Sequence, residues 1–599
     1  MPNLTCNCQA FMKKFMLPSI NKKKAYMYYM LILVIIHVIC NKSIKTISFM
    51  PDDYIPIINA ATITSNVDWS HCRQINFYYG YPLSLIYSPL FLVKKIYTDS
   101  YRLTQSLLSI SSMFHVISSV LLLKIVDWLS YERLKPTTLM MIGFLSSLSL
   151  QFYSMSIWAG GESLFILCNL TVFFLYTKLE NEFLLSYIAL GFFTILTYTV
   201  NSRGIVIVLA LCVVMLHREI IHKFDYLINN ISFWFTVIIL MVLHESLFKP
   251  IFLKYFYSHE SSTGIANTNT AGFISKIESL LFNSQYLIYF IKCIIRTIWV
   301  LGVNTYGLSY ILLIILIKYV KKNKTSVRNY NRILFFELFI LTIMGTTVLY
   351  AIVRSKNEFS IDRADMLFYA RYHSFLIPLI IVLSLTAIID ERFTFSIRDC
   401  ALVSICNLAF FIFFANDIKR VIGMRYSIVH STYIAMFLGN YFNNCRFGIV
   451  NYEPFYIVEL ISLVFIIAVV IVKNKKYLIS LGIIISCILA LSYSQKIVRN
   501  MSNYYCDLLE NDLITCIEEN SCNDIYISDS QIAWVMQYCY AEKVIWGTEI
   551  NQQDMLIIKQ DSLKNYQIDN SIYTLDIKSD KWNVFIKKEL NQQISVDQP

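Results

Sequence analysis

Long apolar runs recur along almost the whole of this 599-residue chain, and they constrain its fold more than any other feature. A helix that crosses a bilayer needs roughly 20 mostly apolar residues. Runs of about that length predict thirteen spans, at residues 25–42, 103–125, 136–157, 162–178, 184–201, 204–217, 231–248, 297–319, 333–353, 372–390, 399–415, 454–472 and 477–494. The sequence therefore predicts a polytopic α-helical membrane protein with about 13 transmembrane helices.

The overall composition supports a membrane protein rather than a soluble one. Hydrophobic residues make up 56% of the chain and charged residues 15%, whereas a soluble domain is about a quarter charged. The formal charge of +11 could indicate nucleic-acid binding. However, Lys and Arg lie mostly in short clusters between apolar runs, which is typical of cytoplasmic loops. We expect no nucleic-acid partner.

The positions of Lys and Arg also predict the orientation of the chain. The basic tail 1–24 is placed inside, because cytoplasmic segments carry the excess of positive residues. The even-numbered connections then fall inside too, and they contain Arg133, Lys135, Lys178, Arg218, Lys223, Lys318, Lys321, Lys322, Lys324, Arg328, Arg392, Arg398, Lys473, Lys475 and Lys476. We expect a multi-pass protein of a bacterial plasma membrane, with a cytoplasmic N-terminus and an uncleaved first span.

The remaining segments define the expected domains. The transmembrane domain, 25–494, has long outside connections at 43–102, 249–296 and 416–453. The final segment 495–599 is polar and lacks a span, and we expect it to form a small extracytoplasmic α/β domain. Its predicted elements are strands at 523–529, 543–546, 554–559 and 582–588 and a helix at 530–540. Disulfides among Cys506, Cys516, Cys522 and Cys539 are compatible with an outside location, but their pairing is open.

Two adjacent carboxylates, Asp52 and Asp53, follow the first span in "FMPDDYIPIINAA". Taken alone, they could simply cap a short helix at the membrane surface. A Tyr- and Pro-rich stretch at 76–95 follows them, and its aromatic side chains suit the interface. These acids are candidates for catalysis because a carboxylate can take the proton of an attacking hydroxyl group.

Further charged residues lie at the predicted outer ends of later spans. Glu162 lies in "SMSIWAGGESLF", Arg203 in "TVNSRG", and Arg371 and Tyr372 in "YARYHSF". A helix dipole could account for Glu162, and the arginines could extend to lipid headgroups. Together, however, outside acids and arginines suit a reaction on a phosphate-bearing lipid, since arginine holds phosphate by charge-assisted hydrogen bonds.

This order of motifs resembles the GT-C-fold glycosyltransferases. The resemblance is to the dolichyl- or polyprenyl-phosphate-sugar mannosyltransferase-like superfamily, which includes protein O-mannosyltransferases and the aminoarabinose transferase. The matching features are the acid pair Asp52-Asp53, "YGYPLSLIYSPL", "SMSIWAGGESLF", Arg203 and Arg371-Tyr372. The resemblance covers residues 25–390, and the rest agrees only in architecture. The pair is Asp-Asp where the family often has Asp-Glu, so which acid is the base stays open.

The resemblance implies a membrane glycosyltransferase, of hexosyl- or mannosyltransferase type, that transfers sugar from a polyprenyl-phosphate donor at the outer face. Asp52 would be the base in an inverting displacement, and Asp53 and Glu162 would support it or hold the acceptor. Arg203 and Arg371 would bind the donor phosphate, with Tyr372 beside them. Weaker candidates for the same binding are Lys254, Arg296, Arg363 and His373. The acceptor could be a lipid, a glycan or a protein, and no cofactor or metal is expected.

Two other classes of function stay open. A transporter or flippase of lipid-linked sugars would favour internal repeats and spans broken by Gly or Pro, whereas this chain has 16 Gly and 11 Pro. A polysaccharide polymerase or ligase would concentrate its key residues in a late outside loop. The connection 416–453 contains Arg420, Arg425 and His430, but the early acid pair favours the transferase.

Overall fold

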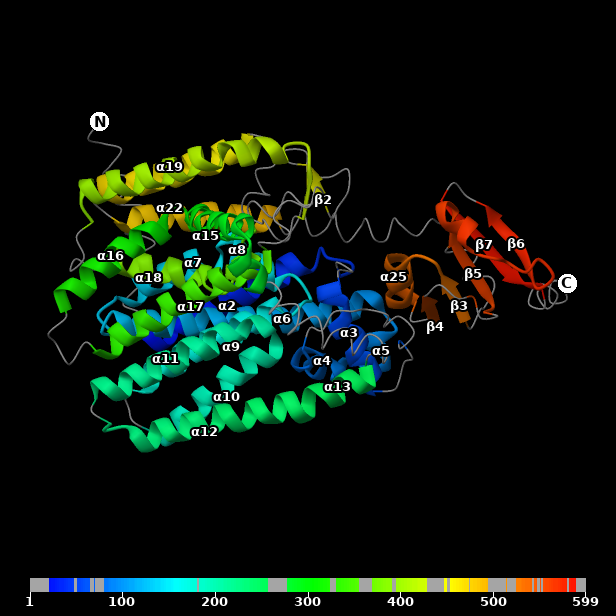
Figure 1. The fold of residues 1–599 in the computed structure, drawn as a ribbon, viewed down its shortest axis with the longest axis horizontal. Helices are drawn as coiled ribbons and strands as arrows, with labels where there is room; N and C mark the ends of the chain where they lie inside the picture. Colours follow the sequence, from blue (N-terminus) through cyan, green and yellow to red (C-terminus); the bar gives the residue numbers. More distant parts are fainter. Residues whose placement is uncertain are drawn as a thin grey trace.

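The computed structural model shows a long bundle of helices with a small sheet domain at one end (Figure 1). It describes residues 21–47, 51–64, 69, 80–179, 183–222, 224–256, 277–323, 330–354, 369–389, 395–427, 447–449, 453–472, 475–493, 513, 524–540, 543–546, 550, 553–578 and 581–588. The apolar helices of the bundle are α2 (Lys22–Asn41), α6 (Ser100–Leu129), α7 (Pro136–Ser147), α8 (Leu150–Ser156), α9 (Glu162–Lys178), α10 (Leu184–Val200), α11 (Ile205–Ile221), α12 (Leu227–Leu243), α15 (Ser284–Asn304), α16 (Leu308–Asn323), α17 (Tyr330–Arg354), α18 (Ile377–Ile389), α19 (Ile397–Val421), α21 (Glu453–Ile471) and α22 (Lys475–Tyr493).

The lengths and surfaces of these helices confirm a multi-pass membrane protein. Among the described residues, seven helices are long and apolar enough to cross a bilayer, or eight if α7 and α8, bent by 70°, form one span. Several others are apolar but shorter. Large apolar side chains are exposed on the outer helices, such as Ile228 (78%) on α12 and Ile412 (70%) on α19. Such surfaces are stable when lipid rather than water covers them.

Two of the predicted boundaries are wrong. The expected single span at 297–319 is two helices, because the chain turns between α15 and α16, where Tyr306 and Gly307 have positive φ angles of 56° and 81°. The expected connection at 249–296 is helical at both ends. α12 continues through a π-helix (His244–Phe248) into α13 (Lys249–Phe256), and α15 begins at Ser284. Both errors arise because these stretches mix polar and apolar residues, so hydropathy alone misplaces their ends.

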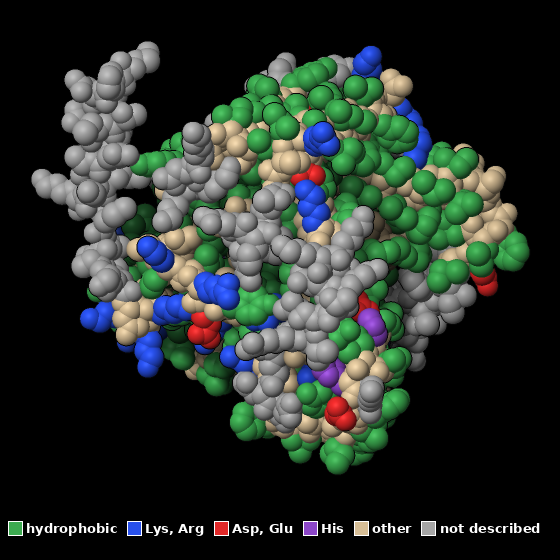
Figure 2. All heavy atoms as spheres, turned by 90° about the vertical axis from the view of Figure 1, so that its left-hand side faces the viewer, with side chains coloured by type: hydrophobic (Ala, Val, Ile, Leu, Met, Phe, Trp, Pro, Cys, Tyr) green, Lys and Arg blue, Asp and Glu red, His purple; other side chains and the backbone are tan. Residues whose placement is uncertain are grey.

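The end of the bundle away from the sheet domain carries many basic side chains (Figure 2). Lys22 forms an ion pair with Asp127 at 2.8 Å, and Lys318 pairs with Asp399 at 2.5 Å. Arg332 donates a hydrogen bond to the carbonyl of Trp128, near the end of α6. These residues belong to the connections predicted to be cytoplasmic, and the sidedness itself stays a prediction.

Short helices lie at the other end of the bundle, between the first and second long helices. They are α3 (Pro51–Thr64), α4 (Pro82–Tyr87), the 3₁₀ helix η2 (Ser88–Leu92) and α5 (Lys94–Tyr97). Within the predicted connection 416–453, strands β1 (Arg425–Ser427) and β2 (Phe447–Ile449) form an antiparallel pair.

The C-terminal α/β domain is confirmed as a five-stranded mixed sheet with one described α-helix. Its elements are β3 (Asp524–Ile527), α25 (Ser530–Tyr540), β4 (Lys543–Trp546), β5 (Met555–Lys559), η12 (Gln560–Asn565), β6 (Tyr573–Lys578) and β7 (Trp582–Lys587). The strand order is β4-β3-β5-β7-β6. β3 is parallel to β4 and β5, whereas β7 is antiparallel to β5 and β6. Strand β6 was not predicted, and Cys506, Cys516 and Cys522 lie outside the described residues, so the disulfides stay a prediction.

Candidate functional site

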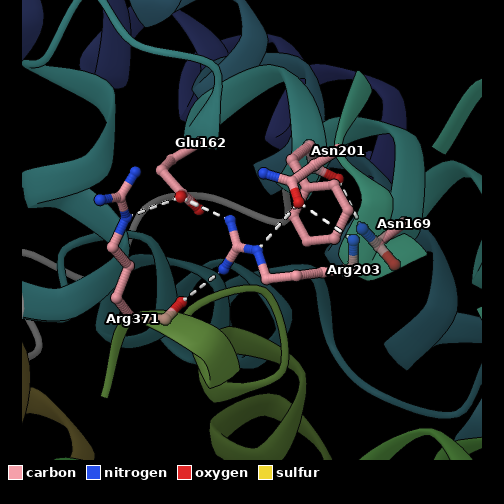
Figure 3. Close-up of polar contacts among 6 residues, drawn as sticks. Glu162, Asn169, Asn201, Arg203 and Arg371 are labelled. Carbon is pink, nitrogen blue, oxygen red and sulfur yellow. Dashed lines mark hydrogen bonds and ion pairs between the residues drawn. The ribbon is translucent and has the colours of Figure 1, made fainter. Parts of the chain in front are cut away.

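A buried carboxylate, Glu162, lies at the centre of the candidate site (Figure 3). Glu162 is the first residue of α9, where the helix dipole favours a negative charge. Its Oε1 atom accepts a hydrogen bond from Nη2 of Arg203 at 2.5 Å and another from Nε of Arg371 at 2.8 Å. The helix terminus therefore contributes to the position of this acid, and two arginines from distant segments hold it.

Arg203 is fixed by the short 3₁₀ helix η4 (Ser202–Gly204) between α10 and α11. The side chain of Asn201 accepts hydrogen bonds from both the backbone N–H and Nε of Arg203, each at 3.1 Å. Gly204 lets this turn lie against the end of α10, because a Cβ atom there would lie 2.7 Å from the carbonyl oxygen of Thr197. The turn thus points the guanidinium of Arg203 at Glu162.

Arg371 and Tyr372 enter from the 3₁₀ helix η9 (Arg371–His373), just before α18. Nη1 of Arg203 donates to the carbonyl oxygen of Arg371 at 3.2 Å. The guanidinium of Arg203 also lies over the rings of Phe165 and Tyr372, 4.9 and 5.1 Å from their centroids. Cation–π contacts of this kind hold a guanidinium in place and leave its charge intact.

Positive charge is concentrated in this cluster. Two guanidinium groups, which stay protonated at any working pH, share one carboxylate oxygen. The side chains of Glu162, Arg203 and Arg371 are only 8%, 10% and 14% exposed. Two arginines brought together in this way can bind an anion by charge-assisted hydrogen bonds. Chemically, the cluster suits a phosphate or another oxyanion.

The predicted acid pair lies on α3 (Pro51–Thr64). Asp53 is buried, with 6% of its surface exposed, and the side chain of Asp52 is outside the described part of the structure. Burial raises the pKa of Tyr87 above its usual range, and the nearby carboxylate of Asp53 raises it further. The Tyr87 hydroxyl donates to the carbonyl of Ala159 at 2.8 Å, three residues before Glu162. Tyr87 therefore connects the α3 acid with the turn that carries Glu162.

The connection between α2 and α6, called loop 1 from here on, also contacts the segment that carries Arg203. Gly80 has a φ angle of 70°, and a Cβ atom on it would lie 2.3 Å from the carbonyl oxygen of Thr199. Only glycine allows so close an approach in this conformation. The contact brings the start of α4 to the end of α10, two residues before Asn201.

An apolar pocket of about 460 Å³ lies beside this contact. Its wall comes from α3, α4, α10 and the α12–α13 segment, and it is formed by Ile63, Tyr81, Leu85, Phe192, Ile195, Leu196, Thr199, Leu240, His244, Phe248, Ile251, Phe252 and Phe256. Leu85 is 52% exposed and Ile251 47%, so the pocket opens onto the apolar outer surface. It suits an apolar chain better than a sugar or a polar peptide.

The other predicted residues lie outside the three-residue cluster. Lys254 is exposed on α13. Arg296 is buried on α15 and donates to the sulfur of Cys293 at 3.1 Å. His373 is buried and lies within hydrogen-bond distance of the Thr347 hydroxyl, at 3.2 Å. Arg363 lies outside the described residues, so its predicted role is not addressed.

Asn201 and Tyr87 were not among the predicted residues. A polar residue two positions before Arg203 offered a weak signal for Asn201, because Asn often closes such turns. Nothing local marked Tyr87, whose partners lie on other segments. In the described part of the chain, no group of three or more His, Cys, Asp or Glu side chains is placed to hold a metal ion; whether the reaction uses a metal stays a prediction.

Comparisons with known proteins place this chain far from characterised sequences. No protein-family model matches it, and no curated protein sequence matches it. Two solved structures are similar in outline, both of ArnT from Cupriavidus metallidurans. The one bound to undecaprenyl phosphate has a TM-score of 0.49 and 9% identity, and the apo structure has 0.46 and 10%. Each similarity covers 93% of this chain and 97% of the ArnT chain.

Proposed function

We propose that this protein is a membrane glycosyltransferase that takes its sugar from a polyprenyl-phosphate donor. The observation that carries the proposal is the buried cluster in which Arg203 and Arg371 share Oε1 of Glu162. Its two converging guanidinium groups suit a lipid phosphate, and Asp53 on α3 lies close enough to affect Tyr87, which contacts the same turn. The order of these residues in the sequence resembles that of the GT-C enzymes.

In this proposal the arginines bind the phosphate of the donor. Guanidinium groups form paired, charge-assisted hydrogen bonds with phosphate oxygens, and burial strengthens these bonds by excluding water. Glu162 keeps the two side chains oriented and offsets part of their mutual repulsion. The same positive charge stabilises the phosphate as it leaves, so the leaving group needs no proton.

The loop-1 carboxylate acts as the base in the transfer step. It takes the proton of the acceptor hydroxyl or amine while that atom attacks the anomeric carbon of the sugar. A bond forms between the acceptor and the anomeric carbon, and the bond from that carbon to the phosphate oxygen breaks. The polyprenyl phosphate leaves with the electron pair, and a single displacement inverts the anomeric carbon. Asp53 is the buried member of the pair, and Asp52 remains the alternative base.

The apolar pocket gives the lipid chain a place next to its phosphate. Thr199 in the pocket wall lies four residues before Arg203, so a chain in the pocket ends close to the arginines. The bilayer then delivers the donor from the side, through the exposed wall around Leu85 and Ile251. The acceptor is a lipid, a glycan or a protein at the extracytoplasmic face.

Mass spectrometry of the lipids that co-purify with the protein tests this proposal. We expect a polyprenyl-phosphate sugar with the wild-type protein and its loss from Arg203→Gln. Arg218→Gln is the matched control, because Arg218 is also a buried arginine but lies at the basic end of the bundle. If no such lipid is found, and sealed vesicles move a lipid-linked sugar without forming a covalent product, the protein is a transporter instead.

The identity of the base is tested by Asp52→Asn and Asp53→Asn in membranes supplied with labelled donor. We expect one of the two variants to lose sugar transfer while its membrane expression is unchanged. Full activity in both variants would contradict a loop-1 base.

A further inference from the structure

The C-terminal domain contacts the helix that carries the acid pair. Helix α25 packs against β3 and β4 on one side and contacts α6 of the bundle on the other. The hydroxyl group of Tyr54, on α3, donates a hydrogen bond to Oε1 of Gln537, on α25, at 3.0 Å. Tyr54 and Gln537 are both fully buried, although 483 residues separate them in the chain.

Aromatic rings surround Tyr54 on several sides. Its ring centroid lies 5.5 Å from that of Trp534, 6.3 Å from that of Tyr538 and 6.3 Å from that of Trp69. Trp534 and Tyr538 belong to α25, whereas Trp69 belongs to the first connection. Aromatic pairs at these distances add to the energy of burial, so α25 holds this part of α3 by packing as well as by a hydrogen bond.

A second hydrogen bond ties α25 to the bundle itself. The hydroxyl groups of Tyr538 and Thr104 lie 2.8 Å apart, and Thr104 is buried near the start of α6. α6 is a helix of 30 residues that also packs against α2, α7 and α9. Helix α25 therefore bonds to α3 through Gln537 and to α6 through Tyr538, so it links α3 to the long helix of the bundle.

Tyr54, which α25 contacts, is next in the chain to Asp53, the buried candidate for the base. Tyr54 directly follows Asp53, and both are buried. Since α3 also packs on α4 and η2, its position sets how Asp53 faces Tyr87. A shift of Tyr54 would move Asp53 with it, because the two residues share one helical turn.

We propose that Gln537 and Tyr538 are positioning residues, which act through Tyr54 and Thr104 to hold the carboxylate of Asp53 in its buried site. This inference rests on the proposed function for its catalytic meaning. The C-terminal domain then contributes to sugar transfer without contacting the reacting atoms. Loss of either hydrogen bond lets α3 open more often and exposes Asp53 to water.

The test is chemical labelling of Asp53 in the intact protein, followed by peptide mass spectrometry. A water-soluble carbodiimide modifies carboxyl groups that solvent reaches, so its rate at Asp53 reports how often α3 opens. The variants are Gln537→Leu, Tyr54→Phe and Tyr538→Phe, in the full-length protein in lipid nanodiscs. Tyr573→Phe is the matched control, because it removes a buried hydrogen bond, to the carbonyl of Gln553, within the same domain but away from α25.

We expect labelling of Asp53 to rise about three- to tenfold in the three variants, as the loss of one buried hydrogen bond would give. Labelling of Glu162 in the same samples should stay unchanged, and so should labelling of Asp53 in Tyr573→Phe. If Gln537→Leu fails to fold, the milder Tyr54→Phe, which removes a single oxygen atom, still decides the question.

Two outcomes overturn the inference: unchanged labelling of Asp53 in all three variants, or an equal rise in Tyr573→Phe, which would indicate general loosening of the domain. Because labelling needs no substrate, the proposed function fails separately. If Asp53→Asn keeps full sugar transfer while the labelling results hold, α25 positions α3 but Asp53 is not the base.

Discussion

Arginines that are buried or largely buried occur at both ends of the helical bundle, and their partners differ. At the basic end, Nη2 of Arg218 donates to the carbonyl oxygen of Leu179 at 3.1 Å, and its guanidinium lies 4.9 Å from the ring centroid of Tyr226. Arg332 donates to the carbonyl of Trp128 and lies 3.5 Å from the ring centroid of Tyr131. Both arginines satisfy carbonyl groups at the C-terminal ends of helices, where positive charge is favoured.

At the other end, Arg203 and Arg371 converge on one carboxylate. They come from segments 168 residues apart and share Oε1 of Glu162. Arg203 and Arg371 are only partly more exposed than Arg218 and Arg332, so burial alone does not explain the contrast. The difference lies in geometry, because two like charges converge on one carboxylate here, whereas each arginine at the basic end donates to a helix carbonyl.

The largest effect should separate Arg203 from Arg218. We expect Arg203→Gln to lower sugar transfer by about 100- to 1000-fold, as removal of a group that stabilises charge in the transition state does. Arg218→Gln should reduce the amount of folded protein but leave the rate per folded molecule within about twofold. Transfer of labelled sugar, normalised to folded protein, measures both. An equal loss of sugar transfer per folded molecule in the two variants would contradict a special role for Arg203.

Replacing the shared carboxylate should show how strongly the two arginines depend on it. Glu162→Gln removes the carboxylate that Arg203 and Arg371 share, which should lower stability by about 3 kcal/mol. Added polyprenyl phosphate should restore more thermal stability to this variant than to the wild type, because ligand binding stabilises the folded state. A thermal-shift series with increasing lipid tests this, and no added protection would indicate that the site does not bind phosphate.

Substitutions at Gly80 and Gly423 test whether the close contact of loop 1 with the end of α10 matters for activity. Gly80 and Gly423 both have positive φ angles, of 70° and 78°, but only Gly80 has backbone atoms close to the position of a Cβ atom. We expect Gly423→Ala to cost about 1 kcal/mol from backbone strain alone. Gly80→Ala should cost more and should also lower sugar transfer. The free energies of unfolding and the activities of the two variants, compared side by side, decide this.

The smallest effect is expected at Arg332. Arg332→Gln removes the donor to the carbonyl of Trp128, at a cost of about 1–2 kcal/mol. We expect a modest drop in melting temperature with donor binding unchanged. A change in lipid binding in this variant would show that the two ends of the bundle are not independent.

Much of the helical fold follows from hydropathy. Most predicted spans coincide with apolar helices, because lipid requires long apolar runs whatever the rest of the chain does. The turn at Tyr306 and Gly307 was missed, since the polar residues there lie among apolar ones and hydropathy alone does not mark the turn. Strand β6 was missed too, because its buried and exposed residues do not alternate regularly.

The candidate site was predictable in part. Glu162, Arg203, Arg371 and Tyr372 stood out because charged residues beside apolar spans are rare, and the structure brings these four into contact. Their roles stay predictions. The contact of α25 with Tyr54 could not be predicted, because no local pattern indicates a pairing between residues so far apart in the chain.

Binding of the donor phosphate tests the central claim most directly. The affinity of a polyprenyl phosphate for the protein in nanodiscs would be compared with that of the uncharged polyprenol, for wild type, Arg203→Gln, Arg371→Gln and Arg218→Gln. We predict that the wild type and Arg218→Gln bind the phosphate at least about tenfold more tightly than the other two variants, and that all four bind the polyprenol alike. Equal phosphate affinity in all four proteins would contradict a phosphate site at the Glu162 cluster.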